Sequence, residues 1–110
     1  MTHGKTERLL LDTVAYLDAS PEKRAFFVVH SQAFKGHVQW LAEQHKVPED
    51  TFKRIEFVTP ERFTDRSRGR LQSVFVDHHA TYSAGVGVRG RFYDALEALK
   101  ARLQSAGASR

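Results

Sequence analysis

Apolar residues recur at helix-like intervals near the start of the chain and then gather into a short unbroken run. Residues 6–18 carry leucine and valine every three or four positions, which predicts an amphipathic helix. Pro21 follows, and proline cannot continue the hydrogen-bond ladder of a helix. Residues 25–30 are apolar without polar alternation, so they predict a strand that is covered on both faces.

The middle of the chain repeats this order of helix and strand. Ser31 is a good N-cap for a second helix. A turn at residues 47–50 leads to a second strand at residues 53–59, where apolar and polar residues alternate. Such alternation predicts a strand at a more exposed edge of the sheet. The inner stripe of the second helix consists of Phe34, Val38, Leu41 and Ala42.

The last part of the chain contains one more strand and a long helix. Pro60, at a first helical position, predicts a single helical turn at residues 59–63. In order, the remaining segments are a polar loop at residues 64–70, a third strand at residues 71–77, a glycine-containing connection at residues 78–90, a helix at residues 91–104 and a disordered tail at residues 105–110.

The alternation of helices and strands favours parallel strands joined by right-handed crossovers. We therefore expect residues 1–110 to form a single α/β domain. The expected architecture is a small three-layer sandwich with a mainly parallel sheet of about three strands and helices on both faces. In open α/β sheets, ligands bind beyond the carboxyl ends of the strands. Those ends carry His30, Thr59 and Asp77.

Composition narrows the class of protein. A chain of 110 residues with 41% hydrophobic residues is long enough for one core. It has no cysteine, which excludes disulfide bonds and thiolate metal sites. Its apolar runs are too short to cross a bilayer, and its first residues do not resemble a signal peptide. We therefore expect a cytoplasmic protein with no membrane partner.

Positive charge is concentrated in one segment of the chain. The formal net charge is +4, and four arginines lie within residues 62–70. Basic segments of this kind bind phosphate groups, which makes Arg66, Arg68 and Arg70 candidates for nucleic-acid contact. The alternative is a solvated, mobile loop that binds no ligand.

Two short motifs carry candidate chemistry. Gly4-Lys5-Thr6 directly precedes the first predicted helix. At a helix N-terminus, backbone amides and an ammonium group attract phosphate, and a hydroxyl can bind Mg²⁺. Asp77 ends the third predicted strand, and its carboxylate can hold the same ion, usually through water.

Together, the two motifs resemble the Walker A and Walker B elements of a P-loop NTPase core of the RecA-like or helicase type. The segments between them, residues 26–30, 57–60 and 76–80, stand in the order of that family's motifs. The resemblance covers residues 4–80. The chain is also similar to small, poorly characterised proteins of actinobacteriophages. That similarity implies that the protein is located in the cytoplasm of the host cell.

The P-loop resemblance implies a role for each motif residue. Lys5 would contact the phosphates of ATP or GTP, Gly4 would permit close backbone approach, and Thr6 with Asp77 would hold the Mg²⁺ of the nucleotide. Only three residues precede Gly4, so most of the phosphate-binding loop and its strand are missing unless the natural start lies upstream. His78 stands where many such ATPases have a glutamate, and it would polarise water poorly. We therefore expect weak or vestigial nucleotide binding, and the sequence favours a protein that is not an efficient NTPase.

A metal-dependent phosphoesterase is one alternative. Asp77-His78-His79 resembles the Asp-His-His motif of the DHH phosphoesterases, which bind Mn²⁺ or Mg²⁺. That family needs further aspartates, which residues 30–36 do not supply. A looser metal site would combine His30 with Asp77, His78 and His79, because adjacent strand ends bring such residues together. Otherwise, His30 is a partly buried histidine with a hydrogen-bond partner, and His78 or His79 faces solvent.

The glycine-rich segment at residues 85–90 has the letters of a dinucleotide-binding fingerprint, but no strand runs directly into it. Arg89 or Arg91 could instead meet a phosphate at the start of the last predicted helix. A flexible connector is the alternative.

A non-enzymatic interaction module is the main competing function. A sheet without the strand that normally precedes a P-loop has unpaired backbone groups along one edge. Such an edge accepts a strand from a protein partner or from a second copy of the chain. The arginine-rich loop would add a surface for nucleic acid. Trp40 follows helical periodicity and is expected in the core, whereas an exposed Trp40 would mark a partner surface.

Overall fold

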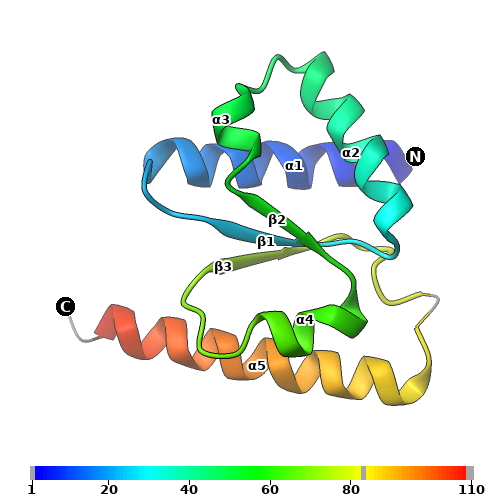
Figure 1. Ribbon diagram of the computed structural model, residues 1–110, viewed down its shortest axis with the longest axis vertical. Helices are drawn as coiled ribbons and strands as arrows, with labels where there is room; N and C mark the ends of the chain where they lie inside the picture. Colours follow the sequence, from blue (N-terminus) through cyan, green and yellow to red (C-terminus); the bar gives the residue numbers. More distant parts are fainter. Residues whose placement is uncertain (1, 83, 109–110) are drawn as a thin grey trace.

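The computed structural model describes residues 2–82 and 84–108 and forms three layers around one parallel sheet (Figure 1). The strands are β1 (Ala25–Val28), β2 (Ile55–Val58) and β3 (Ser73–Val76), in the order β2-β1-β3. Both pairs of neighbouring strands are parallel and in register, so all three strands end at the same level. The predicted small α/β sandwich with about three parallel strands is confirmed.

Helices cover both faces of this sheet, as the alternating pattern predicts. Figure 1 shows α1 (Thr2–Ala19), α2 (Gln32–Gln44) and the short α3 (Glu49–Phe52) on one face of the sheet, the first face. It shows α4 (Pro60–Arg66) and α5 (Val86–Ala108) on the other, the second face.

The central strand β1 divides the core into two parts. Successive side chains of a strand point to opposite faces. Phe27 therefore packs beneath α1 and α2, while Phe26 packs against α4 and α5. The Phe26 ring meets Phe63 of α4 edge-on at 5.4 Å between ring centroids. Every residue of β1 is fully buried, which explains why its sequence lacks polar alternation.

Strand β2 lies at one edge of the sheet, where its alternating sequence places it. Ile55 and Phe57 are buried against the helices of the first face. The alternation predicts that Val58 faces outward, away from the core. This prediction is wrong, because Val58 is buried against the second face of the sheet. The reason is α4, which packs over that face of β2.

Several helix boundaries differ from those predicted from sequence. α1 begins at Thr2 rather than at residue 6, α4 extends through Arg66, and α5 already begins at Val86. Residues 47–50 are not only a turn, because α3 begins at Glu49. Residues 105–108 of the predicted tail are helical, and residues 109–110 lie outside the described part of the chain.

Two glycines in the first turns of α5 explain why its start is missed from sequence. Gly87 and Gly90 each disfavour a helix by about 1 kcal/mol relative to alanine. Burial of Phe92 and Leu96 against the second face outweighs that cost. Gly69 acts differently, since its φ of +70° makes the turn between α4 and β3.

Trp40 is not in the core. Its side chain lies on the outer side of α2 and is 53% exposed, beside the ring of His37 at 6.2 Å between centroids. Val38 and Leu41 on the same helix are buried, which confirms the predicted inner stripe of α2. Only the predicted core position of Trp40 is wrong.

Arg54, just before β2, fixes the end of α1. Its guanidinium donates hydrogen bonds of 3.0 Å to the carbonyl oxygens of Leu17, Ser20 and Lys23. These carbonyls belong to the last turn of α1 and to the turn that leads into β1, where helix C-termini leave acceptors without partners. Arginine suits this position because its donors are fixed in a planar fork.

We expect Arg54→Lys to destabilise the fold by about 1 to 3 kcal/mol, because one ammonium cannot reach three separate carbonyls. The measurement is the free energy of unfolding from urea denaturation. Arg24→Lys is the matched control, since Arg24 is exposed and makes no hydrogen bond or ion pair within the described residues. An equal effect of both variants would contradict the capping role of Arg54.

Candidate functional site

The carboxyl ends of the three strands meet at one edge of the sheet. Val28 is in register with Val58 on one side and with Val76 on the other. The residues that follow, His30, Thr59 and Asp77, therefore come together at this edge, as the parallel topology predicts.

The first residues of α1 lie at the same edge, and one of them contacts Asp77 directly. The hydroxyl of Thr6 donates a hydrogen bond of 2.7 Å to Oδ1 of Asp77, across 71 positions of sequence. Both residues are only 1% exposed. The two side chains that were predicted to share one Mg²⁺ are thus in contact with each other.

Further hydrogen bonds hold Asp77 in place. Its backbone amide donates to the carbonyl of Val28 at 3.0 Å, which continues the β-ladder one residue past β3. Its second carboxylate oxygen accepts from the backbone amide of His79 at 3.3 Å. Both carboxylate oxygens of Asp77 therefore accept a hydrogen bond from the protein.

Gly4 and Lys5 lie inside α1 rather than in a loop before it. The expectation that Gly4-Lys5-Thr6 precede the helix is therefore wrong, because α1 continues back to Thr2. Lys5 is exposed, and a Cβ atom on Gly4 would meet nothing within 4 Å. Among residues 2–82 and 84–108, no close backbone approach requires glycine at position 4.

The histidines near the edge do not gather into a metal site. Within residues 2–82 and 84–108, no group of three or more His, Asp or Glu side chains could hold a metal ion. The rings of His78 and His79 lie 3.7 Å apart between centroids and are tilted by 43°, and His79 packs on Tyr82 at 4.8 Å. His30 packs instead on the ring of Phe34 in α2.

His78 has a buried ring atom without a hydrogen bond. Its Nδ1 is shielded from solvent and has no partner within the described part of the chain. A buried polar atom without a partner costs free energy, so His78 is held in place by its neighbours and not by its own hydrogen bonding. This position gives no support for a water-activating role.

A small cavity of about 70 Å³ lies between the sheet edge and the start of α5. His30 and Thr59 line it from the strand ends, and Val88 closes it from α5. Glu61 of α4 adds a carboxylate, so the cavity contains both an imidazole and an acid. Its volume is too small for a nucleotide, whose pockets start at about 300 Å³.

The arginine-rich segment is organised by one carboxylate. Arg66 donates through Nε and through Nη2 to Oε2 of Glu56, and Nη1 of Arg70 lies 3.6 Å from Oε1 of the same side chain. The Glu56 side chain is only 10% exposed, so these contacts are partly shielded from water. Arg66 and Arg70, both predicted to contact nucleic acid, thus share one carboxylate, and their side chains remain 54% and 41% exposed.

Arg68 differs from its neighbours. Its side chain is 77% exposed and lies 3.7 Å from Asp65, which is equally exposed. Exposed pairs of this kind contribute about 0 to 1 kcal/mol, so Asp65 does not prevent Arg68 from binding another anion. Arg68 lines a groove between α4 and α5 together with Arg91, whereas Arg89 lies outside that groove.

Two residues of this region were missed by the sequence analysis. Glu56 alternates with apolar residues in β2, and this pattern predicts only that it lies on the exposed side of the strand. Arg102 lies near the end of α5 and donates hydrogen bonds to the backbone of the loop after α4. A lone acid opposite four nearby arginines was the available signal for Glu56, and no local signal marks Arg102.

Comparisons with protein-family models, with curated proteins and with solved structures found no match. Within the described residues, no helix is long and apolar enough to cross a membrane.

Thr6→Val is expected to destabilise the fold by about 1.5 to 3 kcal/mol, because it leaves a buried carboxylate without its side-chain donor. Urea denaturation at neutral pH measures this change. Thr13→Val is the matched control in the same helix, since the Thr13 hydroxyl is also buried but bonds only the carbonyl of Leu9. The control should lose less than about 1 kcal/mol, and the reverse order would contradict a structural role for the Thr6–Asp77 bond.

Proposed function

We propose that this chain is a P-loop-like domain that binds phosphate or nucleotide weakly at the start of α1 and does not hydrolyse nucleotide efficiently. The observation that carries the proposal is the buried hydrogen bond between Thr6 and Asp77. It joins a hydroxyl and a carboxylate that the P-loop resemblance assigns to a single Mg²⁺.

The surroundings of this pair support the proposal. The pair lies at the carboxyl edge of a parallel sheet, where α/β domains bind their ligands. The first turn of α1 lies there too, and its backbone amides carry the positive end of the helix dipole. Lys5, adjacent to Thr6, is exposed and can reach an anion at this helix end.

The donor chemistry fits a Mg²⁺-bound nucleotide, but the arrangement limits its affinity. Hydroxyl and carboxylate oxygens are the ligands that Mg²⁺ prefers. Here the hydroxyl of Thr6 is bonded to Asp77, and the other oxygen of Asp77 is bonded to the amide of His79. Binding of the ion would exchange these bonds for metal ligands, which reduces the net gain.

The same arrangement argues against fast turnover. The described residues before Gly4 are helical, so they form no loop that could wrap the phosphates with backbone amides. His78 follows Asp77, and its ring lies against the ring of His79, which in turn packs on Tyr82. Nothing in this geometry orients a water molecule for attack on a phosphate.

Calorimetric titration with ATP and with GTP, each with Mg²⁺, tests the proposal. We expect weak, saturable binding, with Kd on the order of 0.1 to 1 mM, because few contacts are available. Lys5→Ala should weaken it about tenfold or more, since a charge-assisted hydrogen bond contributes about 1.5 to 3 kcal/mol. Lys100→Ala is the control, because Lys100 is exposed on α5, on the opposite face of the sheet.

Two results would contradict the proposal. One is the absence of heat at millimolar nucleotide with the folded wild-type protein. The other is binding that Lys5→Ala and Lys100→Ala weaken equally, which would indicate only a general attraction to a basic protein.

A second candidate function, protein interaction through a sheet edge, is favoured by strand β3. β3 pairs with β1 on one side only, and its four residues are all partly exposed. The amide of Asp77 faces β1, so alternation along the strand directs the backbone groups of Val74 and Val76 outward. An edge of this kind can pair with a strand of another chain or with β3 of a second copy.

Val74→Pro tests the edge, because it removes one outward amide and leaves the bonds to β1 in place. We expect the wild-type protein to self-associate as its concentration rises, and the variant to stay monomeric, in sedimentation velocity runs. Val74→Ala is the control that keeps the amide. A wild-type protein that remains strictly monomeric would exclude self-pairing.

A further inference from the structure

A groove between α4 and α5 lies on the face of the sheet opposite α1. The two helices touch through the rings of Phe63 and Phe92, 5.3 Å apart between centroids. Beside this contact is a cavity of about 310 Å³, at the lower end of the volumes that ligand pockets occupy. Its lining comes from α4, from the turn after α4 and from α5, and consists of Thr64, Ser67, Arg68, Arg91, Asp94, Ala95, Ala98 and Arg102.

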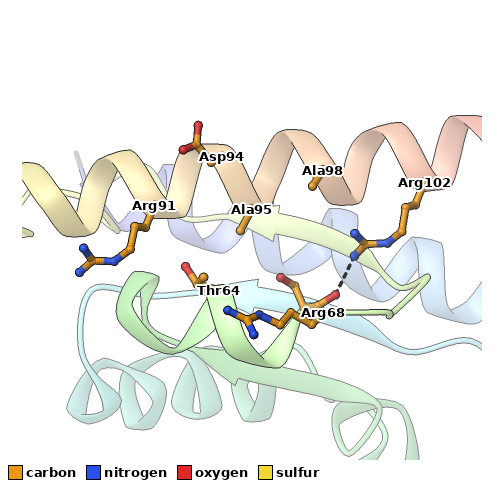
Figure 2. A pocket seen from close by; sticks show the side chains of 8 residues that line it. Thr64, Arg68, Arg91, Asp94, Ala95, Ala98 and Arg102 are labelled. Carbon is orange, nitrogen blue, oxygen red and sulfur yellow. Dashed lines mark hydrogen bonds between the residues drawn. The ribbon is translucent and has the colours of Figure 1, made fainter.

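The floor of the groove is made of small side chains. Ala95 and Ala98 stand on the face of α5 that borders α4, and Thr64 lies opposite them on α4 (Figure 2). Alanine leaves the backbone of α5 open to close approach by another chain. A surface of this kind accepts apolar side chains, because nothing large fills the space above it.

The lining residues of α5 follow the spacing of a single helical stripe. Arg91, Ala95, Ala98 and Arg102 are separated by four, three and four positions. The stripe is about 17 Å long, which corresponds to three turns of helix. A helix lying along this stripe would match its length and present its own residues at the same spacing.

Positive charge dominates the walls. Figure 2 shows Arg91 and Arg68 on opposite sides of the groove, with both guanidinium groups pointing toward the start of α5. Arg91 has no acidic partner within the described residues, and the pairing of Arg68 with Asp65 is exposed and weak. Asp94 is the only acid in the lining, and Figure 2 shows its carboxylate pointing away from α4.

Arg102 fixes the shape of the groove. Its guanidinium is bonded within the protein and does not add to the positive charge that faces a ligand. Its Nη2 donates a hydrogen bond of 2.7 Å to the carbonyl of Ser67, drawn in Figure 2, and its Nε donates to the carbonyl of Arg70 at 3.3 Å. These bonds hold the segment after α4 against α5. They therefore fix the position of Arg68 relative to Arg91.

We propose that this groove binds an acidic amphipathic helix of a partner protein, about three turns long. The apolar side chains of that helix would lie on Ala95 and Ala98, and its carboxylates would bind Arg68 and Arg91. Two features favour a peptide over a single strand of nucleic acid. The floor is aliphatic, and the lining contains no aromatic ring on which a base could stack.

The test uses a labelled helical peptide of about 15 residues, with leucines at positions i, i+3, i+4 and i+7 flanked by glutamates. Fluorescence anisotropy measures its binding to the full chain. We expect saturable binding that Arg91→Glu weakens about tenfold or more, as for the loss of a central interface residue. A peptide with glutamine in place of glutamate should bind correspondingly less well.

Arg89→Glu is the matched control, since it makes the same charge change on an exposed residue of α5 outside the groove. It should leave the affinity nearly unchanged. Ala98→Phe fills the floor at an exposed position and should also abolish binding. Circular dichroism of each variant checks that the fold is retained.

Three outcomes would overturn the proposal. They are no saturable binding of the peptide, equal losses in Arg91→Glu and Arg89→Glu, and full binding in Ala98→Phe. A single-stranded oligonucleotide that binds more tightly than the peptide and loses affinity in Arg91→Glu would assign the groove to nucleic acid instead. The groove is remote from Lys5, so these results are independent of the nucleotide titration.

Discussion

The three layers of this domain depend on the burial of one strand on both of its faces. β1 has neighbours on each side in the sheet and helices above and below, and none of its four residues is exposed. Phe27 packs in the core beneath α1 and α2, and Phe26 packs in the core above α4 and α5. Neither helical layer could dock without the side chains that this strand supplies. The same packing fixes where all three strands end, and thus where Asp77 lies.

Polar contacts then attach the helices of the two faces at particular points. Thr6 joins the start of α1 to Asp77, and Arg54 holds its end through backbone carbonyls. On the other face, Arg102 holds the segment after α4 against α5. Each of these contacts joins segments that are distant in sequence. They explain how short strands of four residues can hold a stable arrangement of long helices.

The fold was predictable from sequence because its strongest signals are periodic. The unbroken apolar run of β1 and the stripe of Val38 and Leu41 in α2 depend on residue spacing alone. Helix ends were less predictable, since Gly87 and Gly90 oppose a helix that tertiary packing of Phe92 stabilises.

The candidate site was predictable only in part. The parallel topology placed Asp77 at the carboxyl edge of the sheet, but its direct hydrogen bond with Thr6 was not predicted, because α1 begins earlier than its sequence pattern indicates. The groove between α4 and α5 was not visible, because Arg68 and Arg91 lie on separate elements. The arginines that pair with Glu56 could not be identified from the sequence. The packing of α4 over β2 decides which side chains lie near this carboxylate.

The long separation between Thr6 and Asp77 also has a consequence for folding during synthesis. Among the described elements α1 leaves the ribosome first, yet the carboxylate it docks against is made 71 residues later. An isolated helix of this length is marginally stable in water. Leu10 and Leu17, which are fully buried in the folded domain, lack their core partners until β1, α2 and β2 have been made. The bond from Thr6 forms only after β3 follows, so the start of α1 is the last part of this helix to be fixed.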